Sequence, residues 1–253
     1  MSLFDYIILI GAVLVGGWSA FKLDKKQKKA IPLVLSFSGA YLLGVTILHV
    51  IPDLFHRPHQ GYNYWMLGGF LLQLLLEKLT NGIEHGHTHA LPVKSYNRML
   101  PILIGLSVHS FLEGFPLGGY QQLAADLAQI DDHHHAHTAG NIHQELLLGI
   151  SLHKMPAAFA LVSMMRLSGF TNRSAWISLL VFSLTAPLSA FFAQHFMAHS
   201  SWLPLIMALV AGSFLHISTT ILFESGDTGE HHFSTWKLSI ILLGFGLSLI
   251  HFH

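Results

Sequence analysis

The chain has 253 residues, of which 52% are hydrophobic and 10% are charged, and its mean hydropathy is +0.52. Because soluble globular proteins carry about 25% charged residues, this composition excludes an ordinary soluble fold and indicates an integral protein of the lipid bilayer. The 13 basic and 13 acidic residues balance, so the chain lacks the excess positive charge that a nucleic-acid partner requires.

A bilayer core about 30 Å thick needs roughly 20 apolar residues per spanning helix. Stretches of that length predict an all-α fold of eight transmembrane helices in one domain, residues 1–253. The first stretch lacks a basic leader and is followed by the basic run Lys22 to Lys29, so we expect it to be retained rather than cleaved as a signal peptide. The predicted spans are residues 3–21, 31–51, 64–83, 100–120, 145–166, 174–195, 203–224 and 236–252.

The basic residues between the spans predict the orientation of the chain. Cytoplasmic loops carry an excess of lysine and arginine. The loops after the first, third, fifth and seventh spans hold nearly all of these residues, whereas the opposite side holds only Arg57. We therefore predict that these four loops are cytoplasmic and that both termini are extracytoplasmic. The residues concerned are Lys22, Lys25, Lys26, Lys28, Lys29, Lys94, Arg98, Arg166, Arg173 and Lys237.

The second span ends in the sequence His-Val-Ile-Pro-Asp, which places His49 and Asp53 four residues apart near the outer surface. Residues at this spacing stack on one face of a helix. Two interpretations stay open. The pair captures a metal ion at the entrance of a pathway, or it is an ordinary polar helix end.

Two histidine-rich segments are predicted on opposite sides of the membrane, residues 84–89 in the cytoplasm and residues 131–143 outside. Clustered imidazoles bind metal ions weakly and flexibly, so these segments suit a local reservoir, and a merely solvated polar loop is the alternative. The stretch Gln122 to Ile130 can be interpreted as a helical continuation of the fourth span. The histidines of the two segments are His85, His87, His89, His133, His134, His135, His137 and His143.

The fourth span carries His109 and Glu113, and the fifth carries His153. An imidazole and a carboxylate four residues apart share a helix face and can bind one metal ion together. The chain has 20 histidines and no cysteine, so a transition-metal site must be built from imidazole and carboxylate, a set suited to zinc, iron(II), manganese or nickel. Pro116 and Pro156 each remove a helical hydrogen bond beside these residues, which suits a substrate site near the midplane.

Plainer interpretations of these residues also stay open. A histidine in a membrane helix is often an interhelical hydrogen-bond donor, which would account for His153 alone. A carboxylate at mid-helix costs roughly 2.5 to 3.5 kcal/mol on insertion scales unless it is paired, and Lys154 would supply Glu113 with a structural ion pair.

The seventh span places His216, Thr220 and Glu224 at intervals of four residues, as a polar stripe that approaches the cytoplasm. We interpret the stripe as an exit route, with a satisfied packing seam between helices as the alternative. Glu77 and Lys78 near the end of the third span are most simply a helix-end pair, and Glu77 is a weaker candidate for the route.

These motifs resemble those of the ZIP (Zrt/Irt-like) family of metal-ion transporters over essentially the whole chain. The specific ones are His-Ser-x-x-Glu-Gly in the fourth span and His-Lys-x-Pro in the fifth. The eight spans, the His-x-x-Pro-Asp ending of the second span and the cytoplasmic histidine loop support them. The resemblance implies movement of a divalent metal, usually zinc, toward the cytoplasm through a site in spans four and five. It also implies elevator-like alternating access, in which spans one, four, five and six move against spans two, three, seven and eight.

The chain departs from the family pattern at the second of the two metal sites that the family commonly has. The family carries asparagine after the span-four histidine and further acidic or histidine ligands in the fifth span, where this chain has Ser110, Lys154, Ala157 and Ala158. The acidic or histidine position of the seventh span corresponds to Thr220. The resemblance therefore transfers one site of three ligands, and it implies that the Lys154 ammonium takes the place of the second cation.

We expect a mononuclear transporter of a divalent transition metal, with Zn²⁺ as the cargo and Fe²⁺, Mn²⁺, Cd²⁺, Ni²⁺ or Co²⁺ as alternatives. We expect no organic cofactor and no enzymatic activity, with the cell membrane as the location and a homodimer left open. Two other classes are considered. One is a non-transporting metal sensor or receptor, suggested by the eroded second site. The other is an intramembrane metal-dependent hydrolase, although the chain lacks the His-Glu-x-x-His of familiar zinc proteases.

Overall fold

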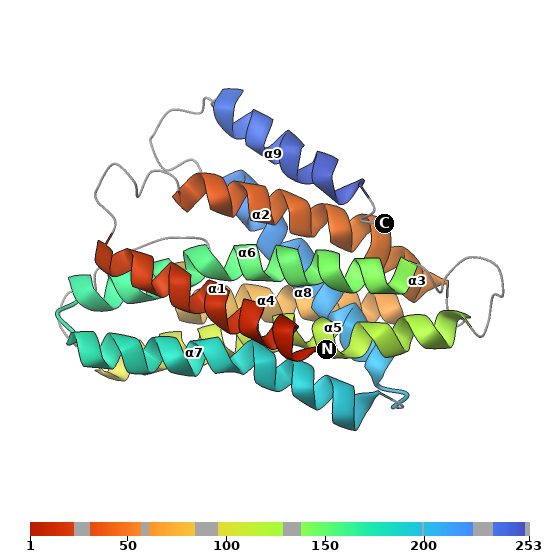
Figure 1. Cartoon of the computed structure of the whole chain (residues 1–253), viewed down its shortest axis with the longest axis horizontal. Helices are drawn as coiled ribbons and strands as arrows, with labels where there is room; N and C mark the ends of the chain where they lie inside the picture. The colour runs from red at the N-terminus through yellow and green to blue at the C-terminus, as the bar shows by residue number, and fades with distance from the viewer. Residues whose placement is uncertain are drawn as a thin grey trace.

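The computed structural model describes residues 1–22, 31–56, 61–83, 96–128, 138–198, 200–224 and 235–250, without the side chains of residues 124–128, 138–141 and 224. Within these residues the chain is helical and contains no strand, which confirms the predicted all-α class. The helices lie alongside one another as a bundle (Figure 1). They are α1 (Leu3–Lys22), α2 (Ile31–Val45), α3 (Ile51–Phe55), α4 (Tyr62–Thr80), α5 (Tyr96–Ala128), α6 (Thr138–Leu167), α7 (Asn172–Phe192), α8 (Leu203–Glu224) and α9 (Thr235–Ser248).

Each predicted span coincides with one helix or one continuous helical unit. Two π-helical turns, η2 (Thr46–Val50) and η4 (Ala193–Met197), continue α2 into α3 and extend α7. The remaining two spans correspond to α4, with 19 residues, and to α9, a shorter apolar helix of 14 residues. Among the described residues, six units are long and apolar enough to cross a membrane, judged by length and composition. They are Leu3–Lys22, Ile31–Phe55, Tyr96–Leu123, Ile142–Leu167, Asn172–Met197 and Leu203–Phe223.

The ends of α5 and α6 differ from the predicted spans. α5 continues to Ala128, which confirms the helical continuation of the fourth span up to that residue. α6 already begins at Thr138, so His143 lies inside a helix and its assignment to the outer histidine loop is wrong. The apolar window underestimated α6 because a helix satisfies its own backbone hydrogen bonds and can extend past its apolar stretch.

Close backbone contacts divide the bundle into two groups of four spans. We call α1, α5, α6 and α7 the site group, and α2 with α3, α4, α8 and α9 the scaffold group. At six glycines in the described residues, an added Cβ would come closer than 3 Å to the backbone of a neighbouring helix, and each contact lies inside one group. These are Gly16 of α1 against α6, Gly114 and Gly118 of α5 against α7, Gly69 of α4 against α8, Gly212 of α8 against α4 and Gly244 of α9 against α2.

The glycines that face the other group meet side chains instead. A Cβ added at Gly149 of α6 would lie 3.1 Å from the Tyr41 ring of α2, and one added at Gly105 of α5 would lie 2.8 Å from the Thr80 methyl of α4. Helices in a bilayer associate mainly through close packing, for which small residues are required. The sequence therefore specifies tight packing within each group and packing mediated by side chains between the groups.

A layer of buried polar residues separates the two largest apolar clusters. Along α5 the apolar residues Leu106 and Phe115 belong to different clusters, and His109 and Glu113 lie between them. α6 shows the same arrangement, because His153 lies between apolar residues of the two clusters. The fold thus places ionisable groups at mid-depth in the bundle, away from both ends.

Candidate metal centre

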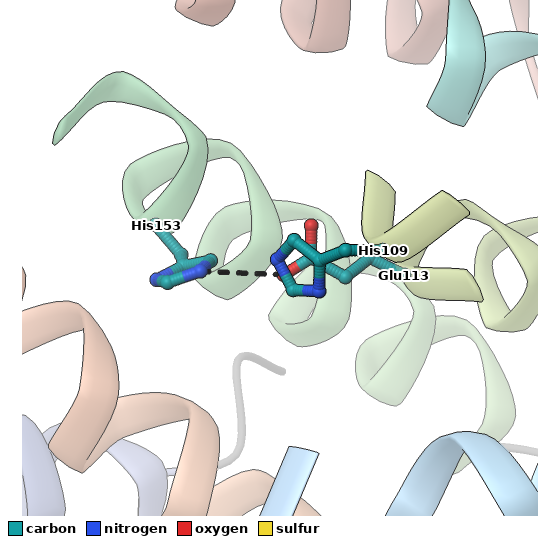
Figure 2. A group of neighbouring side chains, drawn as sticks. All are labelled: His109, Glu113 and His153. Atoms are coloured by element: carbon teal, nitrogen blue, oxygen red, sulfur yellow. Dashed lines mark ion pairs between the residues drawn. The ribbon is translucent and has the colours of Figure 1, made fainter. Parts of the chain in front are cut away.

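Facing surfaces of α5 and α6 bring together the three residues predicted to bind a metal. His109 Nε2 and His153 Nε2 each lie 3.4 Å from Glu113 Oε1, and one ligand atom from each of the three residues lies within 4.8 Å of the others. All three side chains are buried. The two imidazoles approach the same end of the carboxylate from different helices (Figure 2). Two nitrogens and one oxygen around a common point are donors that zinc and iron(II) accept.

The second oxygen of Glu113 is bound by Lys154. Its Nζ donates to Glu113 Oε2 at 2.7 Å and to Ser110 Oγ at 2.8 Å, and the ammonium lies 5.4 Å from the centre of the Phe182 ring. The predicted structural ion pair therefore forms, but it uses a different oxygen from the one that faces the imidazoles. The ion pair and a metal ligand are compatible roles for one carboxylate.

A polar contact from α7 completes the surroundings of the ammonium. Thr185 Oγ1 lies 2.6 Å from Ser110 Oγ and also donates to the Phe182 carbonyl oxygen of its own helix at 2.8 Å. Thr185 was not singled out from the sequence, because a threonine in an apolar helix commonly bonds to its own backbone. Ser110 Oγ thus contacts both Lys154 Nζ and Thr185 Oγ1, and these hydrogen bonds form one network around the ammonium.

The scaffold group contacts the centre through Gln73 of α4. Its amide oxygen lies 3.2 Å from His109 Nδ1 and accepts a hydrogen bond of 3.1 Å from the Ser213 hydroxyl of α8. An acceptor at this place suits the tautomer of His109 that carries its proton on Nδ1 and turns the Nε2 lone pair toward Glu113. A hydrogen bond of this kind orients a metal-binding imidazole and raises its basicity. The sequence signal was a single amide in an otherwise apolar stretch of the third span.

Both prolines lie inside continuous helices. Pro116 belongs to α5 and Pro156 to α6, and neither helix is interrupted there. Proline still removes one backbone donor, so a carbonyl near each group of ligands lacks its helical partner. The predicted local disturbance is therefore confined to hydrogen bonding within an unbroken helix.

The predicted entrance residues contact different partners. His49 Nε2 lies 3.5 Å from Glu145 Oε2 of α6 and 3.2 Å from the Ser248 carbonyl oxygen of α9. Asp53 accepts a hydrogen bond from the Tyr120 hydroxyl of α5. His49 lies in the π-helical turn η2, which changes the helical register that the spacing of four assumed. Glu145 is fully buried and was not identified from the sequence, because only its position against another helix distinguishes it.

Of the predicted exit residues, His216 forms a pair with Glu77 inside the scaffold group. His216 Nε2 lies 3.4 Å from Glu77 Oε2 of α4, which joins α8 to the residue held as a weaker candidate. Thr220 donates to the His216 carbonyl oxygen of its own helix at 2.9 Å, so this contact does not extend to the centre. Glu224 is the last residue of α8, and its side chain lies outside the described part of the chain.

One histidine of the two histidine-rich segments lies within the described residues. His143 lies in α6, is buried, and has Nε2 3.2 Å from Asp5 Oδ2 of α1, so it packs two helices of the site group together. The other predicted loop ligands lie outside the described residues, and they are His85, His87, His89, His133, His134, His135 and His137.

Comparison with known proteins identifies the family of this bundle. The model of a family described as ZIP zinc transporters matches residues 83–251, which include both helices that carry the centre. The chain belongs to the ZIP family. ZIP proteins are integral membrane transporters, so membership makes this chain a multi-pass membrane protein and speaks against the hydrolase alternative.

Individual ZIP proteins match over part of the chain. Zinc transporter ZIP9-B of Xenopus laevis is 28% identical over 173 residues, which cover 65% of this chain and 52% of the relative. ZIP9 of Micropogonias undulatus is 28% identical over 173 residues, covering 65% and 51%. ZIP9 of Macaca fascicularis is 32% identical over 138 residues, covering 51% and 53%. The chain thus spans about half the length of the curated relatives it matches.

Proposed function

We propose that this ZIP family member carries a divalent transition-metal ion, with zinc as the principal cargo, across the membrane toward the cytoplasm. The observation that carries the proposal is the buried convergence of His109, Glu113 and His153 at mid-depth in the helical bundle. Ionisable side chains at such a depth are costly and mark ion pathways. Relatives that are named zinc transporters support zinc as the cargo.

The site suits a single ion. Three protein donors leave a coordination position for water, which an ion needs if it is to be released again. The Lys154 ammonium binds the other Glu113 oxygen at 2.7 Å and balances its charge there. A second cation beside Lys154 would be repelled, so the contacts of this carboxylate support a mononuclear centre.

Alternating access is supported by the division of the bundle. All three proposed ligands belong to the site group, whose helices meet through glycine contacts. The scaffold group contacts the centre through a side-chain hydrogen bond from Gln73, which can break and form again at modest cost. The site group can therefore carry its ion past the scaffold group as a unit.

The path on either side of the centre uses the remaining predicted residues. We propose that ions approach past His49 and Asp53 and leave past His216 and Glu224, with Thr220 beside the exit. The histidine-rich segments on either side would act as weak reservoirs that supply and receive the ion.

The test is zinc uptake into proteoliposomes that contain the purified protein. Glu113→Ala and His153→Ala should abolish saturable uptake, because each removes one of three ligands. His195→Ala is the control, since this exposed histidine contacts the carbonyl of Phe191 in its own helix at 2.9 Å. Unchanged uptake in both ligand variants would overturn the mechanism. Saturable binding without flux would favour a sensor, and flux measured with other divalent metals would define selectivity.

A further inference from the structure

Glu145 is a second fully buried carboxylate of the site group, and the central site does not use it. It lies on α6 with 0% of its surface exposed, and its Oε2 is 3.5 Å from His49 Nε2 of η2. The His49 side chain is 12% exposed, so the pair joins the bundle interior to its surface. A buried carboxylate is retained where a positive partner stabilises it, and that partner can be an imidazolium or a metal cation.

The geometry of this pair resembles that of the central site. There, the imidazole Nε2 atoms lie 3.4 Å from Glu113 Oε1, and here the corresponding Nε2 to Oε2 distance is 3.5 Å. The Ser248 carbonyl oxygen lies 3.2 Å from the same His49 nitrogen and adds a third polar atom. A divalent cation replaces the proton on a histidine nitrogen when it binds. One imidazole and two oxygen donors form an incomplete ligand set that water can complete.

The position along α6 connects the pair to the centre. Glu145, Gly149 and His153 follow one another at intervals of four residues and share one helix face, so the two ligands are separated by about 12 Å of helix. Between them the Tyr41 ring of α2 fits against Gly149, where an added Cβ would be 3.1 Å from the ring. The Tyr41 hydroxyl is buried, makes no hydrogen bond with the described residues, and interacts electrostatically with Glu145.

We propose that His49 and Glu145 form an outer divalent-cation site, which holds the ion before it passes Tyr41 to the central site. Binding at this site is independent of transport, whereas its place in the pathway rests on the proposed function. The pair spans the two groups, because His49 belongs to the scaffold group and Glu145 to the site group. A cation bound there bridges them on the side predicted to face outward.

Crystals of the protein grown with Cd²⁺ and measured by anomalous scattering give the direct test. Wild-type protein should show one peak between His49 and Glu145 and another among His109, Glu113 and His153. Glu145→Gln, which preserves the shape of the side chain, should lose the outer peak and keep the inner one. A wild-type crystal with only the inner peak would overturn the outer site and leave the proposed function intact. A wild-type crystal with the outer peak and no inner peak would contradict the proposed function instead.

Transport kinetics provide a second measurement. Glu145→Gln should raise the KM for zinc about tenfold with a smaller change in kcat, since the outer site gathers ions but does not carry them. Asp5→Asn is the matched control. It breaks another histidine–carboxylate pair, between Asp5 of α1 and His143 of α6 at 3.2 Å, and both of these helices belong to the site group. An equal rise of KM in both variants would assign the His49–Glu145 pair to structure and overturn its role as a binding site.

Discussion

The contacts inside each group of helices differ from the contacts between the groups. Inside, glycines such as Gly118 and Gly212 bring helix backbones together, whereas between the groups Gly149 and Gly105 meet the side chains of Tyr41 and Thr80. A bilayer supplies little hydrophobic drive for helix association, so close packing is the main source of helix–helix affinity. From this difference we expect the first kind of contact to maintain the fold and the second kind to rearrange in the proposed transport cycle.

Filling a backbone contact inside a group should have a large effect on stability. Gly118→Val should prevent correct packing of α5 against α7, because even its Cβ would collide with the Ala190 carbonyl oxygen. Overpacking typically lowers the free energy of unfolding by about 1–3 kcal/mol. Because the contact here is with backbone, which cannot move aside, we expect a loss of ~3 kcal/mol or more. Gly149→Ala, which meets a side chain at 3.1 Å, should keep the fold. Thermal unfolding in detergent compares the two, and equal Tm values would remove the distinction between the two kinds of contact.

A covalent bond between the groups should stop transport without unfolding the protein. A Cβ at Gly105 of α5 would lie 3.4 Å from the Leu79 Cβ of α4, near the roughly 3.5–4.5 Å that a disulfide requires. The chain contains no cysteine, so Leu79→Cys with Gly105→Cys forms an isolated pair. A Thr80→Ser background removes the methyl that a Cβ would meet at 2.8 Å. Oxidation should abolish zinc uptake, and reduction should restore it.

The matched cross-link lies inside the scaffold group. A Cβ at Gly39 of α2 would lie 3.2 Å from the Ile221 Cβ of α8, so Gly39→Cys with Ile221→Cys in the same background should also oxidise. Its uptake should survive oxidation, because both helices belong to the scaffold group. Continued uptake with the Leu79–Gly105 bond closed would show that the groups do not slide past each other.

Breaking the buried charge pair inside the site group should reduce stability. Lys154→Met leaves the Glu113 carboxylate without its ammonium partner, and breaking a buried pair in this way costs about 3–5 kcal/mol. Adding Glu113→Gln to Lys154→Met should recover most of this loss, since no unpaired charge remains. Denaturant unfolding of the two variants tests the point, and additive losses would show that the two residues do not stabilise each other.

The smallest effect is expected from the hydrogen bond between His109 and Gln73, one of those that cross between the groups. Gln73→Met removes the acceptor for His109 Nδ1 while roughly keeping the side-chain length. Loss of a partner to a ligating histidine typically weakens metal affinity about tenfold or more. Gln73→Glu should retain or strengthen binding, because a carboxylate is also an acceptor. Zinc titration of the purified protein measures the affinity of both variants. Equal zinc affinities in Gln73→Met and wild type would show that contacts other than Gln73 orient the His109 imidazole.

The sequence predicted what depends on local spacing. The spans follow from apolar length, and His109 and Glu113 share a face because they are four residues apart on one helix. Gln73 and Glu145 were missed because their roles depend on contacts with helices distant in the chain. Helical spacing relates residues of one helix only and does not show which helices pack together. The joint role of His49 and Asp53 was predicted from an α-helical register that the π-helical turn changes. His143 was misplaced because hydropathy does not mark the polar first turns of α6.

The ammonium beside Glu113 also decides how the membrane potential acts on the proposed carrier. With Lys154 and Glu113 charged and both imidazoles neutral, the empty centre has no net charge, and the loaded centre has the two charges of its cargo. Moving one elementary charge through 100 mV is worth about 2.3 kcal/mol, so a potential negative inside draws the loaded centre inward with roughly twice that energy. The empty centre returns without electrical work. In the proposed cycle, Lys154 would thus place the voltage dependence in the loaded step, while the net charge moved per cycle stays that of the cargo.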